Sequence, residues 1–195
     1  MIIAIKEGDR VVIGHSITDW CRFTDKDYVD EENLAIKFSN TGKVFACADM
    51  NRRSDILLYD DELLNFEVSP KSVVKEIIPY VKDRLKENDI PIDKGNWENS
   101  LVICDNEHIY DVGPSFEFRE VHDFVCHGYR EVDAIISVLD ATPNISAEKR
   151  IIKAVSFASE IHKQNLFPLV ITDTKEKALK IIYDGEFENE HFDSV

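Results

Sequence analysis

The chain has 195 residues, of which 44% are hydrophobic and 31% charged, and this balance is typical of one globular domain. The formal net charge of -15 disfavours contact with a phosphate backbone, so we expect no nucleic-acid partner. No run approaches the roughly 18 apolar residues that a membrane helix needs. The start also lacks a basic region followed by an apolar stretch, so we expect a cytoplasmic protein without membrane association.

The opening "MIIAIKEGDRVVIGHS" predicts a β-hairpin. Apolar residues begin at once in Ile2–Lys6, stop at Glu7-Gly8-Asp9 and resume in Arg10–Ser16. Similar short runs separated by turn residues predict seven further strands, at Asn33–Ser39, Lys43–Ala48, Ser100–Asp105, His108–Val112, Phe116–Arg119, Asp123–His127 and Leu166–Thr172. Several of these runs ("VVIG", "VFACA", "LVIC", "LVIT") are apolar on both faces, which indicates sheets covered on both sides.

Helical patterns fall between the groups of strands. Arg53–Phe66 predicts a short helix, and Ser69-Pro70 begins a second one, with Pro79 expected to kink it. A third helix is expected near Tyr129–Asp140. A fourth begins after Asn144 or Ser146 and carries the apolar residues Ile151, Ile152, Val155, Ala158 and Ile161.

The order of elements is therefore four strands, two helices, four strands, two helices and one strand. This order predicts an α+β fold, a four-layer αββα sandwich in which two antiparallel sheets are each covered by a helix pair. We expect one domain over residues 1–183 and an acidic tail, "DGEFENEHFDSV", over residues 184–195.

This layout resembles the proteasome β-subunit family and the bacterial proteasome-like peptidases of the N-terminal nucleophile hydrolase class. The stretch "IIAIKEGDRVVIGHS" looks like the family's first hairpin. "NSLVICDNEHIYDVGPSFEFREVHDFVCHGYREVDAIISVLDA" looks like its second half, and "NISAEKRIIKAVSFASEIHK" with "LFPLVIT" looks like its last helix and strand. The likeness covers roughly residues 1–172 and is one of layout.

In that family, the first residue of the first strand is a Thr, Ser or Cys nucleophile. Its own α-amine, with a pKa near ~8, accepts the proton. Here the first residue is Met1, and aliphatic residues follow it. The family's acidic residue falls at or beside His15, and its lysine falls near Asn33. Its Gly-Ser-Gly turn is matched by His127-Gly128-Tyr129, so the resemblance implies the fold without the threonine peptidase chemistry.

Two functions remain open at this stage. The first is a non-catalytic proteasome-like protein, a pseudoenzyme that is structural, self-assembling or ligand-binding; the resemblance implies a homo-oligomer, and a ring would be in keeping with it. The second is a hydrolase or peptidase of this class that acts through a rebuilt site or after an unrecognised processing event. A small-molecule or peptide ligand would be taken in a candidate pocket lined by Met1, His15, Asn33, Cys47, Arg52 and Tyr129.

Other combinations of reactive residues have plainer interpretations. The four cysteines lack C-x-x-C pairing, so we expect buried free thiols. His15-Ser16 with Asp19 has the residue types of a triad, but neighbours on a strand point to opposite faces.

The segment 122–127 contains His122, Asp123, Cys126 and His127, which could be metal ligands. At most two of them share a face of the strand, so we expect no metal, and no cofactor is indicated. The adjacent Arg52 and Arg53, or the turn "HGYRE", could bind an anion or serve only structural roles.

Overall fold

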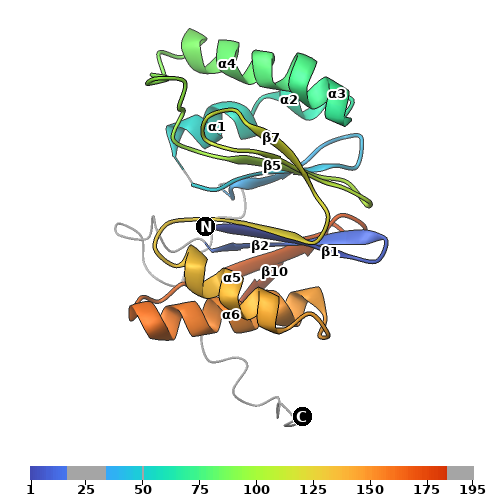
Figure 1. The fold of residues 1–195 in the computed structure, drawn as a ribbon. Helices are drawn as coiled ribbons and strands as arrows, with labels where there is room; N and C mark the ends of the chain where they lie inside the picture. Colours follow the sequence, from blue (N-terminus) through green and yellow to red (C-terminus); the bar gives the residue numbers. More distant parts are fainter. Residues whose placement is uncertain (17–33, 50, 184–195) are drawn as a thin grey trace.

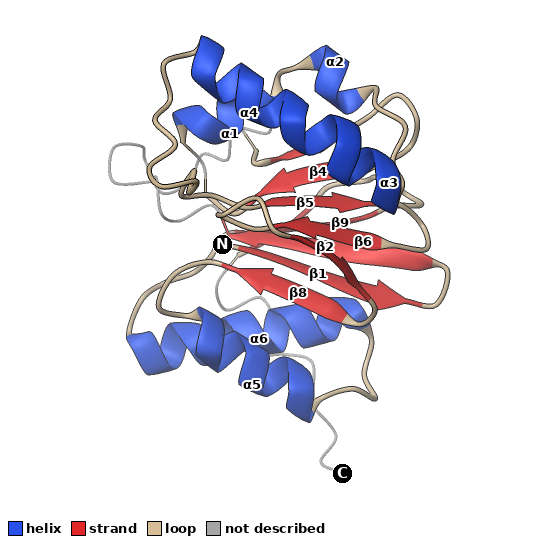
Figure 2. Cartoon of the chain, turned by 45° about the horizontal axis from the view of Figure 1, so that its top comes forward, coloured by secondary structure: helices blue, strands red, loops and turns tan. Residues whose placement is uncertain are grey.

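Two antiparallel sheets pack face to face between two layers of helices, so the predicted four-layer α+β sandwich is confirmed (Figures 1 and 2). The computed structural model describes residues 1–16, 34–49 and 51–183; the predicted acidic tail lies outside this part of the chain. One sheet runs in the order β10 (Lys180–Ile182), β9 (Leu169–Asp173), β2 (Arg10–Ser16), β1 (Ile2–Glu7) and β8 (Phe124–His127). The other runs β3 (Ile36–Phe38), β4 (Val44–Cys47), β5 (Leu101–Cys104), β6 (Ile109–Val112) and β7 (Phe118–Val121).

Each predicted strand region overlaps a strand, and β10 is one that the sequence analysis missed. The segment Lys180–Ile182 has only three residues, too few to display the alternation that identifies a strand. It forms because Ile181 pairs with Val170 of β9, the strand before it in the sequence.

Helices α1 (Arg52–Leu58), α2 (Asp61–Leu64), α3 (Pro70–Ser72) and α4 (Ile78–Glu87) cover the outer face of the β3–β7 sheet. The single helix expected over Arg53–Phe66 is divided at Asp60, whose extended backbone ends α1 and whose carboxylate caps α2. The expected disturbance at Pro79 takes the form of a π-helical segment, Val73–Ile77, directly before α4. Proline has no N–H for the α-helical bond to the fourth preceding carbonyl, and a π turn is one way to accommodate it.

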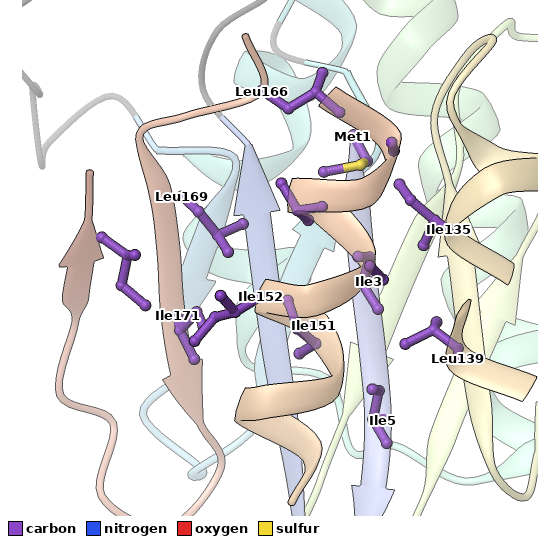
Figure 3. Packing of buried hydrophobic residues seen from close by; sticks show 14 of the residues in the cluster. Met1, Ile3, Ile5, Ile135, Leu139, Ile151, Ile152, Leu166, Leu169 and Ile171 are labelled. Atoms are coloured by element: carbon purple, nitrogen blue, oxygen red, sulfur yellow. The ribbon is translucent and has the colours of Figure 1, made fainter. Parts of the chain in front are cut away.

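Helices α5 (Val132–Ala141) and α6 (Ala147–His162) cover the outer face of the other sheet. Figure 3 shows the apolar side chains that fill the space between these helices and the sheet. Helix α6 approaches β2 closely because Gly14 has no side chain; a Cβ there would lie 2.6 Å from Cγ2 of Ile151. A second apolar layer lies between the two sheets and a third under α1–α4.

Candidate functional site

The start of β1 lies at one end of the sandwich, beside the gap between the two sheets (Figure 2). The α-amine of Met1 donates a hydrogen bond to the carbonyl oxygen of Ala48 at 2.9 Å. Ala48 follows β4 and donates its own N–H to the carbonyl of Ser100, just before β5. The amine therefore joins the β1 sheet to the β4–β5 end of the opposite sheet.

The side chain of Met1 turns away from the gap between the sheets. It is 3% exposed and belongs to the apolar cluster under α5 and α6, where Figure 3 shows it beside that helix layer. A Cβ on Gly128 would lie 3.2 Å from Cγ of Met1, so the turn after β8 packs against this thioether. Ile2 follows on the opposite face, in the core between the sheets.

Two histidines flank Ile2 on the inner face of the sheet. The register pairs Ile2 with His15 of β2 on one side and with His127 of β8 on the other. His15 is fully buried, and neither ring nitrogen has a hydrogen-bond partner in the described part of the chain. Burial, with the charge of the Met1 α-amine added to it, lowers the pKa of His15 well below 6.5. His15 is therefore a neutral imidazole next to a cationic amine.

His127 bridges the two sheets by contacting the buried carboxylate of Asp111, which the largely exposed side chain of Arg119 also contacts. Its Nε2 lies 2.6 Å from Oδ1 of Asp111 in β6, and Arg119 of β7 donates to Oδ2 of Asp111 from Nη2 at 2.6 Å and Nε at 3.1 Å. Asp111 is fully buried, and burial raises the pKa of its carboxyl. The hydrogen bonds and charges of His127 and Arg119 outweigh burial and hold that pKa below its ordinary value of 3.8.

The sequence analysis missed this cluster, although one signal for it was present. Asp111 is the only charged residue in the buried strand "IYDV", and a buried carboxylate needs a partner. Arg119 lies directly opposite Asp111 on β7. The predicted hairpin of these two strands would have allowed that contact to be inferred from the sequence. His127 comes from the other sheet, and that contact depends on the tertiary fold.

The turn "HGYRE" does not leave its amide free for an outside anion. The N–H of Tyr129 donates to Oε1 of Glu131 at 3.1 Å, and Glu131 is itself buried. A Cβ on Gly128 would lie 2.5 Å from that same oxygen, so a larger residue there would displace the Glu131 carboxylate from this hydrogen bond. The tyrosine side chain points outward and is 80% exposed.

The remaining predicted pocket residues lie elsewhere. Cys47 is buried in the core under α1–α4, on the outer face of its sheet, and burial raises the pKa of its thiol. Arg52 is exposed and donates to the carbonyl of Asn88 at the end of α4, at 3.0 Å, whereas Arg53 pairs with Glu98 at 2.8 Å. The two arginines thus engage separate groups of the chain. Asn33 lies outside the described residues, as does Asp19 of the considered triad.

Among the described residues, the hydroxyl of Ser16 and the thiol of Cys126 lie near the start of β1. The N–H of Ser16 donates to the carbonyl of Met1 at 3.2 Å, and its hydroxyl donates to the carbonyl of Leu166 at 2.7 Å. Cys126 lies on the helix-facing side of β8, and burial raises the pKa of its thiol to about 12, although the nearby α-amine opposes the shift. Within the described ranges, no three His, Cys, Asp or Glu side chains come together as a metal site would require.

Comparisons with known proteins identify the fold. No family model matches the chain, and no curated protein matches it. Among solved structures, BPH from Thiobacillus denitrificans superposes with a TM-score of 0.68 at 18% identity, covering 88% of this chain and 96% of that one. The chain has the proteasome-like fold of the N-terminal nucleophile hydrolases.

Two further solved structures with the proteasome-like fold agree with this assignment. Anbu, an ancestral β-subunit from Yersinia bercovieri, has a TM-score of 0.65 at 11% identity and covers 94% of this chain and 87% of its own. HslV from Trypanosoma brucei has a TM-score of 0.54 at 16% identity and covers 88% and 97%. A second structure of the Thiobacillus protein contains epoxomicin.

None of the described helices of this chain is long and apolar enough to cross a membrane.

Proposed function

We propose that this chain is a non-catalytic protein of the proteasome-like fold, a structural or ligand-binding subunit that associates with copies of itself. One observation carries the proposal: the start of β1 presents a thioether to the helix-side core and an α-amine bonded to Ala48. A peptidase of this class needs a hydroxyl or thiol at that position, because only such a group can attack the amide carbonyl.

The groups near the α-amine do not replace the missing nucleophile. The amine of Met1 donates a hydrogen bond to the carbonyl of Ala48. The hydroxyl of Ser16 has its proton committed to a backbone carbonyl on the helix-facing side of the sheet. The thiol of Cys126 has a pKa of about 12, so at neutral pH almost none of it is the thiolate that would attack. An α-amine at the start of β1 with no attacking group beside it among the described residues supports a binding or structural role.

Self-association is supported by the family resemblance and by the outer face of α6. Proteasome-like proteins assemble into rings through their helix layers. In this chain Phe157 and Ile161, one turn apart on α6, are 40% and 54% exposed. Apolar side chains at this spacing form a stripe on one helix face, and such a stripe is suited to contact with another protein surface.

A second candidate function is a hydrolase with a rebuilt site around His15. The observation that favours it is the neutral imidazole of His15, which lies beside the Met1 amine and whose ring nitrogens have no hydrogen-bond partner among the described residues. A neutral imidazole is the basic form, and a strongly shifted pKa beside a specific charge is a feature of many active sites.

Peptide hydrolysis, measured together with native mass on the purified full-length chain, separates the two candidates. For the wild type we expect no turnover of short fluorogenic peptides above the blank, and a native mass that is a multiple of 22.4 kDa. The matched variants are His15→Gln and, as a control on the opposite helix layer, Lys71→Gln. Turnover that His15→Gln abolishes and Lys71→Gln leaves intact would overturn the proposal in favour of the rebuilt site. A monomeric native mass would remove self-association from it.

A further inference from the structure

The turn between β5 and β6 holds a histidine beside the edge strand β7. His108 comes directly before β6, and Tyr110 of β6 pairs with Glu120 of β7. Residues directly opposite in a sheet share one face, as do residues two apart along a strand. Tyr110 belongs to the core under α1–α4, and the ring of His108 stacks on it. His108 and Glu120 therefore both lie on the outer face of this sheet.

The ring of His108 is held in place by two contacts. Its Nδ1 lies 3.0 Å from Oδ1 and 3.2 Å from Oδ2 of Asp105, and it stacks on Tyr110 with ring centroids 5.5 Å apart. The carboxylate of Asp105 is itself fixed, because its Oδ1 accepts the N–H groups of Glu107 at 2.8 Å and His108 at 2.7 Å. An ionised carboxylate can only accept hydrogen bonds, so Nδ1 carries the hydrogen. In the neutral ring, the lone pair is then on Nε2.

Nε2 of His108 lies near a second acceptor, the carboxylate of Glu120. Its distance from Oε1 is 3.9 Å, which is too long for a hydrogen bond. A tetrahedral zinc ion, with bonds of about 2.0–2.2 Å to nitrogen and oxygen, holds two such atoms about 3.4 Å apart, so a movement of about 0.5 Å would complete that geometry. The two side chains are 38% and 33% exposed, and both are therefore open to ions from solvent.

The two carboxylates also make the electrostatic potential at this point negative. Burial, with the charges of Asp105 and Glu120 added to it, raises the pKa of Tyr110 to about 12. The chain as a whole has a formal net charge of -15. A cation is therefore attracted both by the local carboxylates and by the total charge of the protein.

The donor atoms indicate which kind of cation would bind. An imidazole nitrogen with a carboxylate oxygen is a donor set of Zn²⁺ and related transition metals, whereas Mg²⁺ and Ca²⁺ take oxygen ligands. A histidine that ligates a metal commonly donates its other ring N–H to a carboxylate, and Asp105 occupies that place here. Two protein ligands leave the remaining positions to water, and no group of three such ligands occurs in the described part of the chain.

We propose that this chain binds a divalent transition-metal ion of the Zn²⁺ class through Nε2 of His108 and the carboxylate of Glu120, with Asp105 as a positioning residue. We name these three residues the His108 site. The expectation of no metal rested on the segment 122–127, which contains none of them. This inference does not depend on the proposed function, because the His108 site and the start of β1 share no residue.

Titration calorimetry on the full-length, metal-free chain at constant ionic strength tests this inference, with Zn²⁺ as the probe and Mg²⁺ as the control of equal charge. We expect saturable binding of Zn²⁺ with a Kd on the order of 0.1 mM, which is reasonable for two protein ligands at the surface. Mg²⁺ should give no saturable heat over the same range. The absence of Zn²⁺ binding, or equally strong binding of Mg²⁺, would overturn the proposal.

Three variants locate the binding. Glu120→Gln keeps the shape of the side chain and removes its charge, and His108→Gln removes the ring, so we expect each to lose at least tenfold in affinity for Zn²⁺. Glu107→Gln removes the same charge from an exposed carboxylate of the same turn and should stay within twofold of the wild type. An equal loss in Glu107→Gln and Glu120→Gln would reveal a general effect of charge and contradict the proposal.

Long-range ¹H–¹⁵N NMR spectra of the histidine rings identify the ligating atom and test the role of Asp105. We expect Zn²⁺ to shift the Nε2 signal of His108 while Nδ1 stays protonated. Asp105→Asn should weaken Zn²⁺ binding by about tenfold and let the metal-free ring populate the tautomer with hydrogen on Nε2, which a merely structural role would not change. A shift in another histidine without one in His108 would overturn the assignment.

Discussion

Replacing Arg119 and His127 together, as Arg119→Met and His127→Leu, is expected to lower the free energy of unfolding by about 3–5 kcal/mol at pH 7. The double variant leaves the carboxylate of Asp111 fully buried without the two groups that hold it. Each single variant keeps one partner and should cost less than the double. Urea unfolding of the four proteins, analysed as a double-mutant cycle, measures these differences.

A third substitution determines whether the charge of Asp111 is the cause. In an Asp111→Asn background no carboxylate needs compensation, so the same double replacement should cost much less. The pH dependence gives an independent check. The partners depress the pKa of Asp111, so the stability they supply is present above about 3.8, the unfolded value, and is lost as the pH falls below it. In the double variant burial alone remains and raises this pKa, so the cost should shrink between pH 7 and pH 5. An equal cost in both backgrounds would contradict this account of the cluster.

The second large effect concerns His15. We expect the wild type to lose stability as the pH falls below about 6.5, by up to 1.4 kcal/mol per pH unit from this one group. The folded chain holds His15 neutral, with a pKa well below 6.5, whereas the unfolded chain binds the proton near 6.5. The unfolded state therefore takes up more protons in this range, and the free energy of unfolding decreases with falling pH.

His15→Leu should remove this dependence. The variant should be at least as stable as the wild type at pH 7.5, because it replaces two ring nitrogens that have no partner in the described residues with an apolar side chain of similar volume. At pH 5 it should be the more stable protein. His122→Gln, which alters an exposed histidine, is the control and should retain the wild-type slope. Parallel slopes for wild type and His15→Leu between pH 7.5 and pH 5 would show that His15 has a partner in the folded protein.

Much of the fold follows from patterns of local sequence. Turn residues divided the strand regions correctly, and runs such as "VFAC" in β4 correctly indicated sheets covered on both faces. The paired helices followed from capping residues and apolar stripes, although the division at Asp60 required knowledge of its backbone conformation. These features depend on interactions within a few residues, which a single sequence displays directly.

The candidate site was only partly predictable. Met1 and His15 do lie near each other, as the opening hairpin implied, because strand pairing fixes the partner of Ile2. Cys47 lies on the outer face of its sheet, and that face could not be assigned in advance because every residue of β4 is buried. The cluster of Asp111, Arg119 and His127 joins two sheets, so its assembly depends on how the sheets pack.

The most direct test of the central claim, that the start of β1 carries no attacking group, is the intact mass of the full-length chain after incubation with epoxomicin. Epoxomicin occurs in complex with a Thiobacillus denitrificans protein of the same fold. An active N-terminal nucleophile peptidase serves as the positive control. We predict an unchanged mass, because the first residues of β1 present a thioether and aliphatic side chains. A mass increase of one epoxomicin, located at the start of β1, would contradict the account. It would show that an attacking group is present there, as in a peptidase of this class.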